Sequence, residues 1–162
     1  MKDKSNDQLI NKIAIEFAKT IELFDLTPIE ARLFAFLYLN EESMTLDEMS
    51  ELIDRSKTSM SISIRSLLEL NLVTRVWKKG VRKDLYKANT QLFKSFMNSF
   101  VNKWIDAANH QRNALEEIKK NIDVESDDKL LTIYNRLATI TEFHKNVESS
   151  FRDLKQNKHQ ED

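Results

Sequence analysis

Residues 55–65, RSKTSMSISIR, place hydroxyl and basic side chains at short spacing among apolar ones. Hydroxyl groups donate and accept hydrogen bonds, and lysine and arginine pair with phosphate, so these residue types suit contact with a polyanion. Small hydroxyl residues also allow close approach to phosphates or base edges. Which partner they can reach depends on the element that carries them.

Two secondary structures compete for this segment. Residues 59–64 alternate polar and apolar side chains, as a half-buried strand does. A helical face with a 3.6-residue period fits a longer stretch, and Ser56 supplies an N-cap for it. The apolar residues on that face are Met60, Ile64, Leu67 and Leu68. We therefore predict a helix, with its serines on and around the face that points away from the core.

A basic hairpin is expected after this helix. Residues 72–77 alternate and are rich in β-branched side chains, residues 83–88 fit a second strand, and the turn between them contains the only glycine. Over residues 55–87, nine basic and two acidic side chains give +7, so the rest of a chain of net charge −1 sums to −8. A positive patch on an otherwise acidic protein indicates a specific polyanion-binding face.

Helices are expected on both sides of these elements. One glycine and one proline in 162 residues favour a mostly helical chain. Capping boxes are predicted at Thr27 with Glu30 and at Thr45 with Glu48, and Asn71 is expected as a left-handed C-cap. The predicted helices are 6–23, 28–40, 46–53, 91–121 and a last one that follows a cap at Ser126. In the last helix, apolar residues from Ile133 to Leu154 follow heptad spacing, which suggests helix-to-helix packing within or between subunits.

A short helix, a tight turn, a basic helix and a Lys/Arg-tipped hairpin together predict a winged helix-turn-helix. The fold class is thus mainly α with a small β-hairpin wing and long C-terminal dimerisation helices. We expect an N-terminal helix at 1–26 that packs on the core or the dimer interface, a DNA-binding domain at 27–90, and helices for dimerisation and effector binding at 91–162.

The predicted contacts to double-stranded DNA come from the basic helix and the wing. The N-terminal part of the helix would enter the major groove, and the wing would follow the backbone or minor groove. For Arg75, a phosphate contact and a solvated strand position are equally good interpretations. The predicted residues are Ser56, Lys57, Thr58, Ser59, Ser61, Ile62, Arg65, Arg75, Lys78, Lys79, Arg82 and Lys83.

Over residues 27–88 the chain resembles the GbsR group of MarR-like repressors. The matching motifs are LDEM at 46–49, SKTSMSISIRSLLELNLVTRV, and WKKGVRKDLY at 77–86, in which the pattern V-W-x-x-G-x-R-K-x-x-Y is the more particular to the group. Asn71 stands where such proteins commonly have glycine. The resemblance implies a homodimer that represses transcription of genes for glycine betaine uptake or synthesis and that, in characterised relatives, senses choline.

A choline site would be built from aromatic faces, which attract quaternary ammonium groups. The candidates are Phe34, Tyr38, Phe96, Phe100 and Trp104, which together would form a cage where the DNA-binding domain meets the dimer helices. Aromatic residues at this spacing are equally typical of an ordinary core. Phe17 and Phe24 are interpreted as core residues.

No nucleophile–base, metal or cofactor motif is found, so an enzyme is not expected, and cysteine chemistry is excluded by the absence of cysteine. The alternatives are a winged-helix protein–protein adaptor, against which the basic wing argues, and a MarR-like regulator without a choline response. Repression and activation are not distinguished. The cytoplasm is expected, because the N-terminus lacks a signal-peptide core and no apolar run is long enough to span a membrane.

Overall fold

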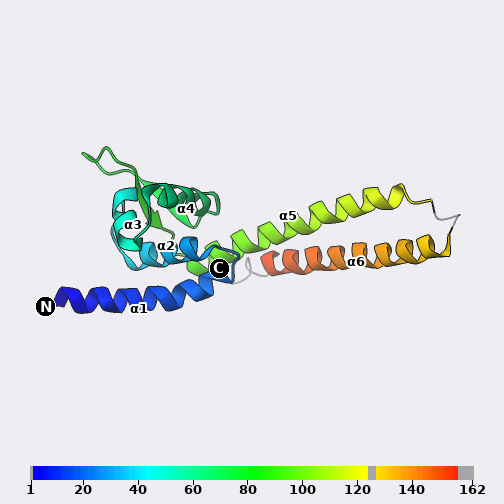
Figure 1. Ribbon diagram of the computed structural model, residues 1–162, viewed down its shortest axis with the longest axis horizontal. Helices are drawn as coiled ribbons and strands as arrows, with labels where there is room; N and C mark the ends of the chain where they lie inside the picture. The colour runs from blue at the N-terminus through cyan, green and yellow to red at the C-terminus, as the bar shows by residue number, and fades with distance from the viewer. Residues whose placement is uncertain (1, 124–126, 157–162) are drawn as a thin grey trace. The chain divides into compact units, whose positions relative to one another are not determined.

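The protein, described here by a computed structural model over residues 2–123 and 127–156, is mainly helical with one two-stranded hairpin (Figure 1). It forms two compact units, Met1–Met97 and Asn98–Asp162. The elements are α1 (Lys2–Glu22), α2 (Pro28–Leu39), α3 (Leu46–Ile53), α4 (Lys57–Glu69), β1 (Val73–Val76), β2 (Leu85–Ala88), α5 (Leu92–Lys120) and α6 (Asp128–Gln156). The predicted fold class is confirmed, although the first helix begins at Lys2 and not near residue 6.

Both predicted capping boxes are present. At the start of α2, the Glu30 backbone N–H donates to Thr27 Oγ1 at 3.2 Å, and the Thr27 N–H donates to Glu30 Oε2 at 2.9 Å. At the start of α3, the corresponding distances between Thr45 and Glu48 are 3.3 and 2.7 Å. Each box satisfies two backbone groups that a helix end otherwise leaves unpaired. The starts of α2 and α3 are therefore fixed by local sequence.

The core of the first unit is built around α2, which packs against α1, α3, α4 and β2. From α2, Leu33, Phe34 and Leu37 are 0–1% exposed, and Ala14 and Ile21 of α1 belong to the same buried cluster. Burial of apolar surface is the main force that holds such elements together. The N-terminal helix is thus part of the core of the unit that carries α3, α4 and the hairpin.

The segment with alternating serines is a helix, as predicted. Met60, Ile64 and Leu67 of α4 are 0–3% exposed and belong to the core. Ser63 is also buried, at 6% exposed, so the prediction that the serines face away from the core is wrong for this residue. Ser63 lies three residues after Met60 and four before Leu67, which places it on the same helical face.

The C-terminal end of α4 confirms the cap expected at Asn71. The residue adopts a left-handed conformation, with φ of 57°. Its N–H donates to Leu68 O, and the N–H of Leu72 donates to Leu67 O, both at 3.0 Å. This pair of bonds is the Schellman motif. Asparagine tolerates the left-handed region better than other non-glycine residues, so α4 ends sharply and the chain turns directly into β1.

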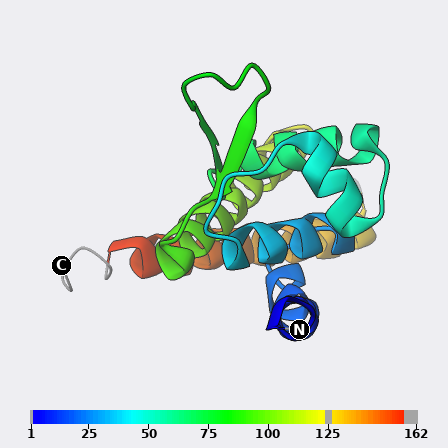
Figure 2. The same cartoon turned by 90° about the vertical axis from the view of Figure 1, so that its left-hand side faces the viewer.

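The hairpin formed by β1 and β2 projects from the first unit (Figure 2). The strands pair antiparallel, with Arg75 opposite Tyr86. Tyr86 also exchanges two backbone hydrogen bonds of 2.9 Å with Met44, just before α3. At the turn, the Val81 N–H donates to Lys78 O at 3.1 Å and Gly80 has φ of 84°, the geometry of a type II turn. The glycine is needed there because φ is positive.

In the second unit, α5 and α6 lie antiparallel, as their contacts show: Lys155 bonds Asn102 at one end, and Lys119 lies over the Tyr134 ring at the other. On α6, Leu137 and Thr141 are each 7% exposed. Other members of the expected heptad, including Ile133 and Ile140, stay more than 40% exposed. The heptad therefore contributes both to the α5–α6 contact and to a surface stripe. Ser126, the expected cap, lies outside the described residues.

Within residues 2–123 and 127–156, no helix has the length and apolar character that crossing a membrane requires.

Replacement of Leu67 by alanine should lower the free energy of unfolding by about 2–5 kcal/mol, because it leaves a cavity beside a fully buried position. Ile62→Ala on the same helix is the matched control, since Ile62 is 65% exposed and should change stability by less than about 0.5 kcal/mol. Urea denaturation followed by circular dichroism measures both. Equal losses for the two variants would contradict the assigned faces of α4.

Candidate nucleic-acid interface

The outer face of α4 carries most of the helical residues predicted to contact DNA. Lys57, Thr58, Ile62 and Arg65 are exposed, and the neighbouring Ser59 and Ser61 are half-buried. None of the six lies in the core, so their side chains are available to a partner. The structure brings them together on one surface because the opposite face of α4 is packed inward.

Ser56 has a structural task at the beginning of α4. Its Oγ accepts a hydrogen bond from the Ser59 backbone N–H at 3.1 Å, which is the expected N-cap. The first turn of a helix has further N–H groups without intrahelical partners, and together with the helix dipole they favour a bound anion. The same turn carries Lys57 and Thr58, so a phosphate that approaches α4 here meets backbone and side-chain donors together.

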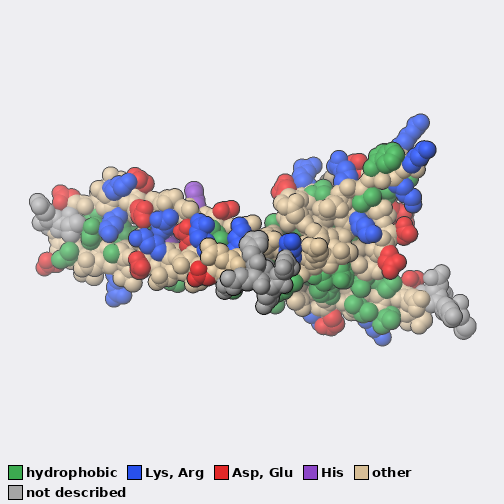
Figure 3. Space-filling view, turned by 180° about the vertical axis from the view of Figure 1, so that it is seen from behind, with side chains coloured by type: hydrophobic (Ala, Val, Ile, Leu, Met, Phe, Trp, Pro, Cys, Tyr) green, Lys and Arg blue, Asp and Glu red, His purple; other side chains and the backbone are tan. Residues whose placement is uncertain are grey.

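The wing adds a second set of cations. Lys78, Lys79 and Arg82 are exposed, and they make no ion pair within the described part of the chain. Figure 3 shows lysine and arginine side chains gathered on the projecting hairpin, next to a hydrophobic one. Trp77 is 82% exposed at the end of β1. Its position beside cationic residues is typical of a nucleic-acid surface, where apolar side chains pack on sugars or bases.

Arg75 is held between two neighbours on the hairpin. Its guanidinium lies 3.8 Å from the Asp84 carboxylate and 5.8 Å from the centre of the Tyr86 ring. The Arg75 side chain is nevertheless 60% exposed. Because exposed ion pairs are weak, Arg75 can exchange Asp84 for another partner.

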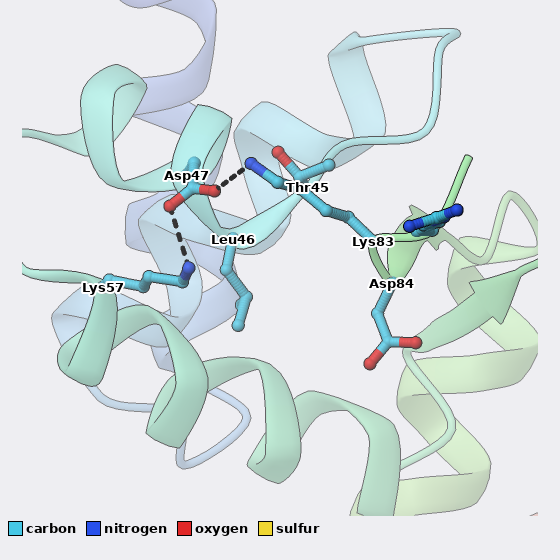
Figure 4. Close-up of a pocket in the computed structure, with 7 residues that line it drawn as sticks. Thr45, Leu46, Asp47, Lys57, Lys83 and Asp84 are labelled. Carbon is cyan, nitrogen blue, oxygen red and sulfur yellow. Dashed lines mark hydrogen bonds and ion pairs between the residues drawn. The ribbon is translucent and has the colours of Figure 1, made fainter.

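Lys57 and Lys83 meet at one carboxylate. Asp47, on the first turn of α3, lies 3.0 Å from Lys57 Nζ through Oδ1 and 2.7 Å from Lys83 Nζ through Oδ2 (Figure 4). The three side chains come from α3, from the start of α4 and from the wing. They line a hollow of about 310 Å³ together with Arg82 and Asp84.

Electrostatics follow from this geometry. The hydrogen bond from Lys83 and then that from Lys57 hold the pKa of the Asp47 carboxyl below its ordinary value. In return, the hydrogen bond to Asp47 raises the pKa of Lys83. Both lysines keep their protons, and the Asp47 carboxylate balances part of their positive charge within the predicted DNA surface. Sequence reasoning missed this role, because Asp47 enters it only within the LDEM motif and no local pattern links positions 47, 57 and 83.

Three of the predicted effector residues lie in one aromatic cluster of the first unit. Phe34 contacts Tyr38 and Phe96, with ring centres 6.3 and 4.9 Å apart. Phe17, interpreted above as core, lies 5.8 Å from Tyr38 and is only partly buried. It lines two adjacent hollows, one with Tyr38 and the other with Phe96. Of the rings in this cluster, Phe17 and Tyr38 are partly accessible and Phe34 is 1% exposed, while Phe93, which lines the second hollow, is 71% exposed.

The other two predicted effector residues belong to a cluster in the second unit. Phe100 and Trp104 lie on α5 with ring centres 5.8 Å apart, and Phe151 of α6 stacks on Trp104 at 5.4 Å and 19°. Phe151 covers one face of the Trp104 ring. Trp104 is still 45% exposed, so much of the rest of its side chain meets solvent. Phe151 was expected only as a heptad residue. A cage formed by all five residues remains a prediction.

The known proteins that this chain resembles in sequence include HTH-type transcriptional repressors. The chain is 31% identical over 146 residues to the HTH-type transcriptional repressor GbsR of Bacillus subtilis (strain 168), covering 85% of this chain and 78% of that protein. It is 28% identical over 120 residues to the HTH-type transcriptional repressor OpcR of the same organism, covering 74% of this chain and 63% of OpcR. No protein-family model matches. A crystal structure of a transcriptional regulator superposes with a TM-score of 0.64 at 17% identity, covering 93% of this chain and 98% of that one, which supports the fold.

Replacement of Lys83 by methionine should raise the pKa of Asp47 toward its ordinary value, because the Lys83 hydrogen bond is the largest cause of the lowering. A depressed carboxyl pKa stabilises the fold above the unfolded pKa, and this contribution disappears as the pH falls through the folded pKa. A pH titration of the Asp47 carboxyl carbon by NMR measures the change. Lys87→Met, at an exposed position of β2, should leave the titration unaltered; an unchanged Asp47 in Lys83→Met would refute the assigned cause.

Proposed function

This chain belongs to the family of the HTH-type transcriptional repressor GbsR, whose members are transcriptional regulators and not enzymes, and we propose that it is a homodimeric repressor that binds pseudo-palindromic double-stranded DNA. The observation that carries the proposal is the surface formed by the outer face of α4 and by the wing. Its exposed cations lie on two elements that a winged helix-turn-helix presents to a duplex.

The two elements have different tasks on DNA. α4 enters the major groove by its N-terminal part, and the serines allow the backbone to approach closely. Arg65, further along the exposed face of α4, is long enough to donate two hydrogen bonds to a guanine. The wing cations Lys78, Lys79 and Arg82 lie along phosphates or the neighbouring minor groove, where contacts position the protein without reading many bases. Affinity thus comes mainly from the wing and specificity mainly from α4.

A second copy of the chain would place two such surfaces on one duplex. Dimeric readers of this type bind half-sites about 34–36 Å apart, so the spacing between the two α4 helices determines which operator fits. The surface stripe of α6 supports the assignment of the dimer contact to the second unit, because it leaves large apolar side chains exposed. Its members are Ile133, Ile140 and Leu154, and the neighbouring Phe143 is exposed as well.

We propose further that a quaternary ammonium compound such as choline is the effector, and that the repressor governs genes for glycine betaine uptake or synthesis. The support is the resemblance described above together with the partly exposed rings of Tyr38 and Trp104. Such a ligand weakens DNA binding only if it binds the conformation that does not hold DNA more tightly, with a coupling of roughly 1–3 kcal/mol.

Binding of a duplex selected from a random library should depend steeply on salt. With roughly six to ten phosphate contacts, the affinity is expected to fall about 10³- to 10⁵-fold between about 50 and 200 mM salt. Arg65→Ala should relax the selected sequence at one base step, whereas Arg82→Ala should weaken binding evenly across sequences. Fluorescence anisotropy at several salt concentrations gives both results. Salt-independent binding, or wild-type behaviour of both variants, would count against the assigned surface.

Choline should change the fluorescence of Trp104 if the second-unit cluster holds the effector. The chain has two tryptophans, so Trp77→Phe makes Trp104 the sole reporter. Replacing Trp104 by leucine should weaken binding about 2- to 30-fold, since a cation–π contact contributes about 0.5–2 kcal/mol. Calorimetry tests the first-unit cluster: choline and glycine betaine are titrated into the parent and into Tyr38→Ala, and weaker binding by Tyr38→Ala is expected if this cluster holds the effector. Absence of heat and of any fluorescence change with both compounds rejects the effector proposal.

A further inference from the structure

Asp47 occupies an unusual position, a carboxylate inside a surface that otherwise gathers cations. Its two oxygens each face one ammonium group, Lys57 at 3.0 Å and Lys83 at 2.7 Å. The relative exposure of the side chains is 40% for Asp47, 60% for Lys57 and 67% for Lys83. All three therefore remain accessible to a molecule that approaches from solvent, and both lysines are proposed DNA contacts.

We propose that Asp47 stands in for a backbone phosphate of DNA: it holds Lys57 and Lys83 while the protein is free and competes with phosphate for them when a duplex binds. The inference rests on the proposed function and deepens it. Its consequence is an affinity penalty that applies to every sequence equally, so that the repressor binds bulk DNA less tightly while its base preference is unaffected.

The geometry fits this substitution. A carboxylate, like the two non-bridging oxygens of a phosphodiester, offers two acceptors that carry negative charge, and distances of 2.7–3.0 Å are those of charge-assisted hydrogen bonds. Arg82 lines the same hollow, which brings a third cation to the place that a phosphate would take. In Figure 4 the Lys57 ammonium lies at Asp47, between the beginning of α4 and that of α3.

Asp47 is not required to hold these elements in place. The start of α3 is already closed by the capping box of Thr45 and Glu48, and the wing strand is joined to the segment before α3 by the two hydrogen bonds between Tyr86 and Met44. Exposed ion pairs contribute little stability of their own. The exchange of Asp47 for a phosphate therefore costs the fold little, which is what a reversible competitor needs.

The salt dependence of binding distinguishes competition from positioning. When the lysines move to phosphates, counterions leave the DNA, but the released Asp47 carboxylate attracts a cation again. In Asp47→Asn no carboxylate is released. The plot of log affinity against log salt should thus be steeper in the variant, and the affinity itself should rise about three- to tenfold, a modest gain because exposed pairs are weak.

The experiment measures anisotropy of an arbitrary-sequence duplex, long enough for both half-sites, with the parent, Asp47→Asn and Asp7→Asn. Asp7 is an exposed residue of α1, so this control makes the same charge change away from the lysines. Tighter binding and a steeper salt slope for Asp47→Asn alone support the proposal. Equal gains in both variants would reflect net charge and overturn it, as would unchanged or weaker binding by Asp47→Asn.

A double-mutant cycle links the effect to the lysines. In a protein with Lys57→Met and Lys83→Met, the gain from Asp47→Asn should disappear; persistence of the full gain overturns the proposal. Asp47→Gln replaces Asp47→Asn if the latter shows a lower melting temperature. A parent protein that binds no duplex at low salt overturns the proposed function and this inference together, whereas a parent that binds while Asp47→Asn shows no gain overturns this inference alone.

Discussion

The burial of one face of α4 is the constraint on which the rest of the first unit depends. Met60, Ile64 and Leu67 are removed from water on a helix that packs against α2, α3 and β1, and hydrophobic burial of this kind determines which side of the helix remains outside. The hydroxyl and basic side chains can then serve a partner without weakening the core. Ser63 is the one hydroxyl residue of this segment on the buried face, where its small side chain fits among the apolar residues.

A second constraint is the way in which the chain leaves α4. The left-handed Asn71 turns it directly into β1, and the bonds between Tyr86 and Met44 tie β2 to the entrance of α3. The helix-turn-helix and the wing are thereby connected through the backbone, so the separation between the two groups of cations is determined by hydrogen bonds and not by flexible side chains.

Local patterns were sufficient to predict the helices, the capping boxes and the strands from the sequence, because caps, period and turn residues act over a few positions. They also indicated which basic side chains of α4 are exposed, since exposure follows from helix phase. They could not indicate that Asp47 joins Lys57 and Lys83, or that Phe151 stacks on Trp104, because these contacts connect residues far apart in the chain. The predicted aromatic cage shows the same limit: spacing along a helix identifies a stripe of rings but not the rings from other helices that face them.

The tip of the wing has a consequence for how such a protein diversifies. A side chain placed at Gly80 would meet no atom within 4 Å, so this position is restricted by its positive φ and not by packing. The length and sequence of this tip can therefore drift without a penalty in the core. Selection on the tip acts through whatever the wing binds, so its contribution to affinity can change while the folded body stays the same.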